Sequence, residues 1–202
     1  MDLGRPFADL IPGARGAVLA TLAQLTVPVT VRTLARHAGV SPQGALSVVN
    51  DLADAGVVHT QRSGPSMMVA LNRAHLAAEP LLSLIALRAR LVERLSDELT
   101  GWDGLAGGWL FGSAARGDGD RRSDIDLLLV ATGSLGSDQW SSQVGALTDA
   151  VQQWTGNPAQ IIEHTRRSLA ALVRADNPLI SELRIDGMPL TPKSRVLLRR
   201  RA

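Results

Sequence analysis

WLFGSAARGDGDRRSDIDLLLV, residues 109–130, is the stretch that decides the fold of the C-terminal half of the chain. The apolar runs at its two ends indicate two buried strands. The chain leaves the first strand through Gly112 and Ser113, and it enters the second through Asp124 and Asp126, which are one residue apart. A plain hairpin does not need this chemistry, so the connection is a candidate binding or catalytic site.

The two aspartates are expected to act together. Side chains alternate between the faces of a strand, so Asp124 and Asp126 point the same way while Ile125 turns into the core. Two carboxylates this close repel each other, and crowding them is costly unless a cation lies between them. Mg²⁺ is commonly bound by one or two carboxylates together with substrate phosphates and water. The pair therefore predicts a site for Mg²⁺ or Mn²⁺.

The Gly-Ser turn predicts the complementary half of such a site. Gly112 permits close backbone approach, and a helix that starts near Ser113 would present free N–H groups to a phosphate. Arg116 lies one turn further on and adds positive charge, unless it pairs with Asp118 or Asp120 of the loop. Together the two halves predict a site in which N–H groups hold a triphosphate and carboxylates hold the bridging metal.

The whole string resembles the nucleotidyltransferase superfamily of DNA polymerase β type, and within it the minimal nucleotidyltransferases of prokaryotes. The resemblance extends over residues 101–192 and includes the later segment DNPLISELRIDGMPL. It implies that Gly112 and Ser113 contact the phosphates of a nucleoside triphosphate, and that Asp124 and Asp126 are the catalytic metal ligands. The acceptor that it implies is a protein hydroxyl, an RNA end or a small molecule.

One position departs from that family's pattern. The family's third carboxylate lies on a later strand, and the matching stretch here is PAQIIEHT, with Gln160 at the aligned position. Glutamine accepts hydrogen bonds but cannot take a proton at neutral pH. Asp149 and Glu163 are alternative acids, although strand alternation turns Glu163 away from the face of Gln160. Two functions stay open: metal-dependent nucleotidyl transfer, and nucleotide sensing without catalysis by a transcription regulator.

The N-terminal half has a different pattern. Helices are expected over residues 14–24, 31–38 and 43–55, with Thr30 and Ser41 as N-caps and Pro42 at a first helical position. Strands are expected over residues 57–60 and 67–71, around a turn at residues 62–65. This order, with TLARHAGVSPQGALSVVNDLADAGVV, resembles the winged helix-turn-helix DNA-binding domain of bacterial transcription regulators.

That second resemblance implies double-stranded DNA as a partner. Gln and Asn side chains read adenine in the major groove, and Arg side chains contact phosphates. The expected contacts lie on the second and third helices and on the wing: Arg32, Arg36, Gln43, Ser47, Asn50 and Arg62. Because this basic set is small, binding as a homodimer is expected. The alternative is that the winged helix serves protein docking or dimerisation.

The predicted fold class is α+β, in three parts. Residues 1–75 form the winged helix-turn-helix domain, and residues 76–100 form a linking or dimerisation helix. Residues 101–202 form the nucleotidyltransferase-like α/β domain with a small mixed sheet. Its further elements are a strand over residues 158–163 and helices over residues 137–156, 168–175 and 179–184.

The composition sets broader limits. The 202 residues include no cysteine, which excludes disulfides and thiolate metal sites. The net charge is only +2, but the pI near 10.3 and the basic end RVLLRRRA favour an anionic partner. No run approaches the roughly 18 apolar residues of a membrane span, and the first residues lack a signal-peptide pattern. A cytoplasmic location without a membrane partner is expected.

Overall fold

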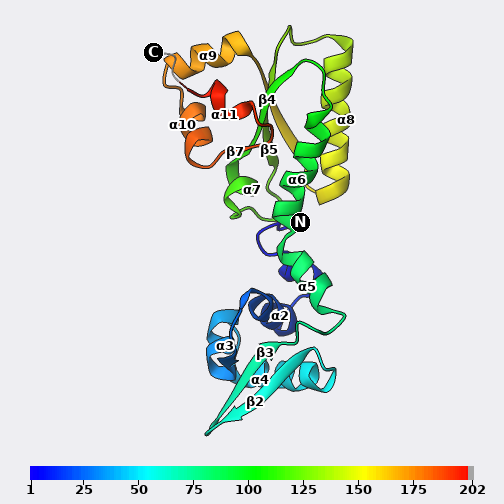
Figure 1. The fold of residues 1–202 in the computed structure, drawn as a ribbon, viewed down its shortest axis with the longest axis vertical. Helices are drawn as coiled ribbons and strands as arrows, with labels where there is room; N and C mark the ends of the chain where they lie inside the picture. Colours follow the sequence, from blue (N-terminus) through cyan, green and yellow to red (C-terminus); the bar gives the residue numbers. More distant parts are fainter. Residues whose placement is uncertain (200–202) are drawn as a thin grey trace. The chain divides into compact units, whose positions relative to one another are not determined.

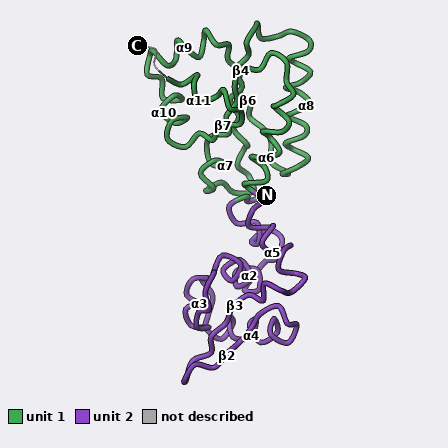
Figure 2. The backbone as a smooth tube through the Cα atoms, viewed as in Figure 1, with its two compact units in different colours: residues 1, 3, 88–202 green, residues 2, 4–87 purple. Residues whose placement is uncertain are grey.

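The computed structural model describes residues 1–199 and divides into two compact units (Figures 1 and 2). The N-terminal unit comprises residues 4–87 together with Asp2. The C-terminal unit runs from Arg88 onward and includes Met1 and Leu3. Residues 200–202, with Arg200 and Arg201 of the basic end, lie outside the described residues.

The N-terminal unit combines helices with one small antiparallel sheet. Its helices are α1 (Pro6–Leu10), α2 (Ala14–Gln24), α3 (Val31–Ala38), α4 (Pro42–Asp54) and α5 (Ala78–Ile85). Its strands are β1 (Val29–Thr30), β2 (Val58–Ser63) and β3 (Ser66–Leu71), in the sheet order β1-β3-β2. The helices and strands expected between residues 14 and 71 are present, whereas α1 and β1 were not predicted.

Local capping chemistry explains why these helices form where the sequence predicts them. The Thr30 side chain accepts a hydrogen bond from the N–H of Thr33, and the Ser41 side chain accepts one from the N–H of Gly44. Gly39 ends α3 in a left-handed conformation with φ 66°, which glycine adopts without strain. The helices bury their apolar faces in one core with Val58, Val69 and Leu71 of the hairpin.

The prediction of a single helix over residues 76–100 is wrong, because the structure has two helices there. α5 ends at Ala86, whose N–H donates to the carbonyl of Leu82, and α6 (Leu87–Thr100) follows. The apolar face of α5 packs against the N-terminal core, whereas α6 buries Leu91, Leu95 and Leu99 in the C-terminal unit. Two short helices therefore serve two separate cores.

The C-terminal unit is built on a small mixed sheet, as predicted, and this sheet has four strands. Its strands are β4 (Leu105–Phe111), β5 (Ile125–Ala131), β6 (Ala159–Thr165) and β7 (Met188–Pro189), in the order β6-β5-β4-β7. β5 and β6 are parallel, and the other pairs are antiparallel. The helices after α6 are α7 (Gly112–Arg116), α8 (Asp138–Thr155), α9 (Arg166–Arg174), α10 (Pro178–Ile185) and α11 (Ser194–Leu197).

Helices cover both faces of this sheet (Figure 1). Trp109, Leu128 and Val130 lie on the face that packs against α9, α10 and α11. Residues of opposite parity face α6 and α8, and a Cβ on Gly108 would lie 3.0 Å from Leu99 and 3.3 Å from Leu129. Strands covered on both sides read as continuous apolar runs, which is why LLLV follows Asp126 in the sequence.

Ser194 fixes α11 to the sheet. Its side chain is fully buried, accepts a hydrogen bond from the N–H of Gly108 at 3.0 Å and donates one to the Gly108 carbonyl at 2.8 Å. A Cβ on Gly107 would lie 3.2 Å from this hydroxyl, so the missing side chain allows the helix to approach. Neither α11 nor β7 was predicted from the sequence. No helix within residues 1–199 combines the length and hydrophobicity needed to cross a membrane.

Candidate functional site

The two halves of the motif meet where Gly112 packs against Asp126. β4 ends at Phe111, which is paired in register with Asp126 on β5. Gly112 then starts α7 with φ +67°, and a Cβ there would lie 2.2 Å from Oδ2 of Asp126. Any other residue would be strained and would displace the carboxylate. The glycine therefore lets the backbone of the turn lie directly against the acid, as close approach to a phosphate also requires.

The two aspartates flank Ile125, the first residue of β5: Asp124 directly precedes the strand, and Asp126 lies within it. Ile125 is buried, and its N–H donates to the carbonyl of Pro158 at 2.8 Å. Asp124 is exposed and Asp126 is half-buried. Burial raises the pKa of Asp126, repulsion by Asp124 and Glu182 raises it further, and Arg116 lowers it in part. Negative charge on Asp126 is thus incompletely compensated by the protein, as expected of a cation ligand.

Ser113 lies at the base of the loop that joins the two motif halves. The N–H groups of Gly117 and Asp118 donate to the Ser113 carbonyl at 2.8 and 3.2 Å. A Cβ on Gly119 would lie 2.9 Å from the Ser113 hydroxyl, so the loop folds back over this side chain. Within the described part of the chain, no side chain caps the first turn of α7. Its N–H groups therefore have no side-chain partner.

A buried asparagine holds the other end of the loop. Asn157, only 1% exposed, donates from Nδ2 to the carbonyl of Ser123 at 2.8 Å and to that of Asp120 at 3.3 Å. A backbone hydrogen bond from Arg122 lowers the pKa of Asp120 and stabilises its carboxylate. These bonds fix the residues immediately before Asp124. Asn157 was not predicted, because its partners are backbone atoms far away in the sequence.

Arg116 is held by two acids. Its Nε lies 3.1 Å from Asp118, the loop partner considered from the sequence, and its Nη1 lies 3.6 Å from Asp186. The hydrogen bond with Asp118 is the largest cause that raises the pKa of Arg116. Both pairs are open to solvent, where such pairs contribute little stability. Arg116 could therefore exchange these partners for a phosphate at small cost.

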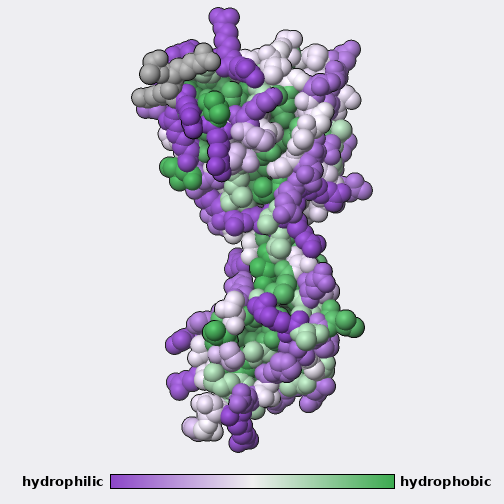
Figure 3. All heavy atoms as spheres, viewed as in Figure 1, coloured by the Kyte–Doolittle hydropathy of each residue, from purple (hydrophilic) through white to green (hydrophobic). Residues whose placement is uncertain are grey.

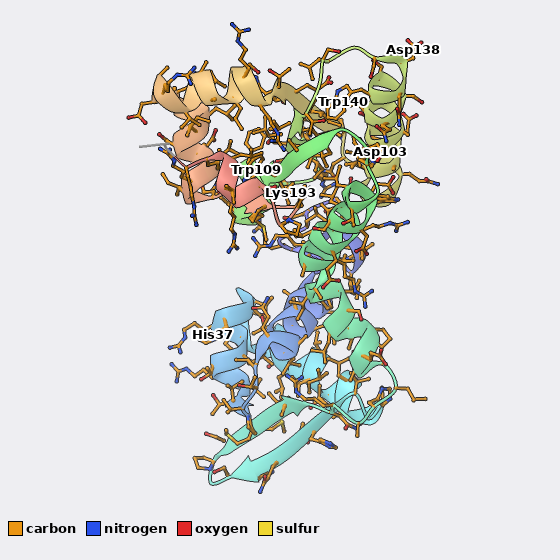
Figure 4. All side chains as sticks on the ribbon, turned by 45° about the horizontal axis from the view of Figure 1, so that its top comes forward. His37, Asp103, Trp109, Asp138, Trp140 and Lys193 are labelled. Carbon is orange, nitrogen blue, oxygen red and sulfur yellow. The ribbon has the colours of Figure 1, made fainter. Side chains whose placement is uncertain are left out.

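The strand register settles the positions of the acids considered as replacements for the third carboxylate. Gln160 is paired with Asp126 and so lies on the same face, whereas Glu163 is paired with Leu129 on the opposite face. There Glu163 accepts a hydrogen bond from Nε1 of Trp140 on α8 (Figure 4). Asp149 is exposed on α8. Within residues 1–199, no group of three His, Cys, Asp or Glu side chains is placed to hold a metal.

Sequence analysis missed one acid on the face of Asp126. Glu182 lies on α10, which packs on this face, and it is near enough to raise the pKa of Asp126. Asp186, the C-cap residue of α10, follows four residues later and pairs with Arg116. Residues with this spacing lie on the same side of a helix. The i, i+4 spacing of Glu182 and Asp186 was visible in the sequence. What placed them at the site was the packing of α10.

These residues fit a divalent cation bound by two protein ligands. Asp124 and Asp126 supply hard oxygen donors, and repulsion between them would be relieved by a cation. Mg²⁺ usually keeps its other coordination positions for substrate phosphates and water, so two carboxylates suffice. The arrangement can bring a metal-bound phosphate chain to the first turn of α7.

The residues predicted to contact DNA all lie in the N-terminal unit and are all exposed. They are Arg32 and Arg36 on α3, Gln43, Ser47 and Asn50 on α4, and Arg62 on β2. The opposite side of α4 is buried through Ala45, Val48, Val49 and Leu52. The exposed side chains of α4 are spaced four and three residues apart and so form one stripe along the helix.

The contact between Gly112 and Asp126 predicts an asymmetric effect of two alanine substitutions. Gly112→Ala should lower the free energy of unfolding by about 1–3 kcal/mol, because the left-handed backbone is strained and the Cβ displaces Asp126. Gly133→Ala is the matched control, since a Cβ there meets no atom within 4 Å. Urea unfolding would measure both. Equal stabilities of the two variants would contradict this role of Gly112.

The raised pKa of Asp126 predicts a pH-dependent stability difference. The folded state binds this proton more tightly than the unfolded state, so ionisation destabilises the fold as pH rises above the ordinary aspartate pKa of about 3.9. Without divalent cations, Asp126→Asn should be more stable than the wild type at pH 7. The gain should disappear below that pKa. Thermal unfolding of the wild type and Asp126→Asn across this pH range measures the difference, and the exposed Asp149→Asn is the control. A stability difference between Asp126→Asn and the wild type that does not change with pH would refute the prediction.

One family model matches a part of the chain. The family model described as "Nucleotidyltransferase domain" matches residues 89–153, which include Gly112, Ser113, Asp124 and Asp126 but less than half of the chain. Gln160 and α9–α11 lie beyond the matched segment. No curated protein matches the chain.

Two solved structures share a distant likeness. One is a toxin–antitoxin crystallised with AMP-PNP, with 22% identity, a TM-score of 0.33, and coverage of 51% of this chain and 71% of that one. The other is a mutant of the toxin–antitoxin MntA-HpeT, with 19% identity, a TM-score of 0.35, and coverage of 55% and 80%. Both likenesses are too distant to carry an argument about this chain. The match over residues 89–153, together with the Gly-Ser and Asp-x-Asp geometry, supports the nucleotidyltransferase superfamily for this part of the chain.

Proposed function

We propose that the C-terminal unit binds a nucleoside triphosphate with Mg²⁺ or Mn²⁺ and transfers its nucleotidyl group to an acceptor hydroxyl. The observation that carries this proposal is the packing of Gly112 against the carboxylate of Asp126. It joins the turn suited to phosphates and the acids suited to a metal in one site. The match over residues 89–153 supports the same activity.

Each residue has a distinct task in this proposal. The N–H groups at Gly112 and Ser113 hold phosphate oxygens, and Arg116 adds a cation after releasing Asp118. Asp124 and Asp126 hold the divalent ion, which when bound neutralises charge on the triphosphate. The acceptor oxygen bonds to the α-phosphorus, and the bond from that phosphorus to the departing pyrophosphate breaks.

The acceptor proton needs a destination other than Gln160. The Gln160 carbonyl can accept a hydrogen bond from the acceptor hydroxyl and orient it, but the amide does not take the proton. Glu182 is the carboxylate on this face that we assign to receive it, directly or through water. Phosphoryl-type transfer depends mainly on positioning and electrostatics, so a displaced base is compatible with turnover.

Gln160 also favours a second candidate function. If no group takes the acceptor proton efficiently, the site binds the metal–nucleotide complex without transfer. The C-terminal unit then acts as a nucleotide sensor for the N-terminal unit. The two candidates share the binding site and differ only in turnover.

For the N-terminal unit we propose a winged helix-turn-helix that binds double-stranded DNA and regulates transcription. The order α2, α3, α4 and the β2–β3 hairpin supports this proposal. The exposed stripe of Gln43, Ser47 and Asn50 on α4 supplies groups that can read base edges. Arg32 and Arg36 on the preceding helix supply phosphate contacts.

Nucleotide binding is expected to depend on both the metal and Asp126. Calorimetric titration with each ribonucleoside triphosphate should give binding with Mg²⁺, little without it, and a loss in Asp126→Asn because the metal loses a charged ligand. Asp149→Asn is the control and should bind as the wild type does. Absence of binding in the wild type would refute the proposed site.

Transfer of an α-phosphate label to protein or RNA acceptors then separates the enzyme from the sensor. Metal-dependent labelling that is lost in Asp126→Asn establishes transfer. Binding without labelling in the wild type, with labelling gained in Gln160→Glu, favours the sensor.

DNA binding is expected to divide into specific and nonspecific contributions. In anisotropy titrations with a duplex selected by the wild-type protein, Asn50→Ala should reduce discrimination against a mismatched base by about 1–3 kcal/mol. Arg32→Ala should weaken all duplexes alike and reduce the salt slope by about one. Gln24→Ala, exposed at the end of α2, is the control. If no duplex is selected, this unit docks protein instead.

A further inference from the structure

The positive charge of this protein is concentrated at its C-terminal end. Residues 166–202 contain nine of the 21 Lys and Arg but three of the 19 Asp and Glu, which gives a net charge of +6. Residues 1–165 contain the remaining 12 cations and 16 acids, which gives −4. The overall value of +2 therefore conceals a strongly basic segment. Such asymmetry is the electrostatic signature of a polyanion-binding surface.

The structure gathers part of this charge around one cavity. The cavity has a volume of about 1040 Å³ and lies between α9, α11 and the beginning of β4. Its apolar lining includes Leu169, Val173 and Leu197. Five cations surround it: Arg166, Arg167, Arg174, Lys193 and Arg199. In this part of the C-terminal unit, Figure 3 shows hydrophilic side chains bordering an apolar area.

These five side chains, which we call the basic rim, have no ion-pair partner among the residues that the structure describes. Within residues 1–199, none of them forms an ion pair, although Arg116 and Arg184 in the same unit do. All five are exposed, and they repel one another. The apolar side chain of Val196, 62% exposed, lies beside them. An anion that also covers apolar surface would reduce the repulsion among the five cations and would shield the side chain of Val196 from water.

The cavity is distinct from the carboxylate site. Ala106 lines it near the start of β4, whereas Phe111 at the end of that strand leads into Gly112. Five residues of strand separate these positions by about 17 Å. Every lining residue except Ala106 lies beyond the segment that matches the nucleotidyltransferase family.

The rim is also built on fixed elements. Lys193, labelled in Figure 4, directly precedes Ser194. The buried hydroxyl of Ser194 holds α11 against Gly108 of β4. Three of the arginines belong to α9, which buries Leu169 and Val173 against the sheet. Cations on anchored helices are partly preorganised, so less conformational entropy is lost on binding.

We propose that the cavity binds the phosphodiester backbone of a nucleic acid. Four of the five cations are arginines, whose planar guanidinium groups match phosphate oxygens in pairs. The aliphatic floor can cover sugar and base surfaces, but no aromatic side chain lines it for base stacking. Binding is therefore governed by phosphate charge and is independent of sequence. This site is separate from the proposed nucleotide and DNA sites of the two units.

Fluorescence anisotropy of the full chain with labelled 20-nucleotide oligo(U) and oligo(dT) tests the proposal. EDTA is present throughout, so that metal-dependent binding at Asp124 and Asp126 does not contribute. The triple variant Arg166→Ala, Arg167→Ala and Arg174→Ala should bind at least about tenfold more weakly, with a salt slope smaller by about two. The double variant Lys193→Ala and Arg199→Ala should weaken binding in the same direction. Circular dichroism verifies that each variant is folded.

The matched control removes three exposed cations elsewhere, through Arg15→Ala, Arg73→Ala and Arg94→Ala, and should retain wild-type affinity. Preference for oligo(U) assigns the site to RNA, and preference for oligo(dT) assigns it to single-stranded DNA. Equal losses in the control and the rim variants would show nonspecific attraction and overturn the proposal. It is also overturned if neither oligonucleotide binds, or if polyglutamate of similar charge displaces them equally well, which would identify an acidic protein partner.

Discussion

The contact between the backbone at Gly112 and the carboxylate of Asp126 is the constraint on which the candidate site depends. A strand that ends in a side-chain-free residue with a left-handed backbone can turn directly over the acid of its neighbour. This turn starts α7, sets the loop over Ser113, and leaves the start of α7 next to the carboxylate of Asp126. Asn157 completes the arrangement by holding the far end of the loop through its backbone carbonyls.

The sheet then separates acids that look equivalent in the sequence. Register places Gln160 beside Asp126, whereas Glu163, three residues later, lies on the opposite face and is bonded to Trp140. The position that would hold a third carboxylate is thus neutral. Glu182 acts on Asp126 from a helix rather than from the sheet.

The C-terminal unit consequently carries opposite charges at the two ends of β4. Carboxylates lie at the end of the strand, where Phe111 meets Asp126, and the basic rim lies near its start. The proposed metal–nucleotide site lies at one end, and the proposed nucleic-acid site lies at the other. Because the strand separates them by about 17 Å, a polymer held at the rim could extend towards the carboxylates. The glycines of β4 and the hydroxyl of Ser194 keep this geometry fixed.

The sequence alone determined the local features, because their causes are local. Ser41 and Pro42 begin α4, and the apolar runs on either side of the Gly-Ser and Asp-x-Asp motif predict the strands β4 and β5 of the mixed sheet. The tertiary structure decided what depends on packing between distant segments. It split the helix predicted over residues 76–100, because the two halves bury their apolar faces in different cores. It also brought Glu182 and Asn157 to the site and formed the basic rim, since residues that meet only across a folded sheet leave no periodic signal in the chain.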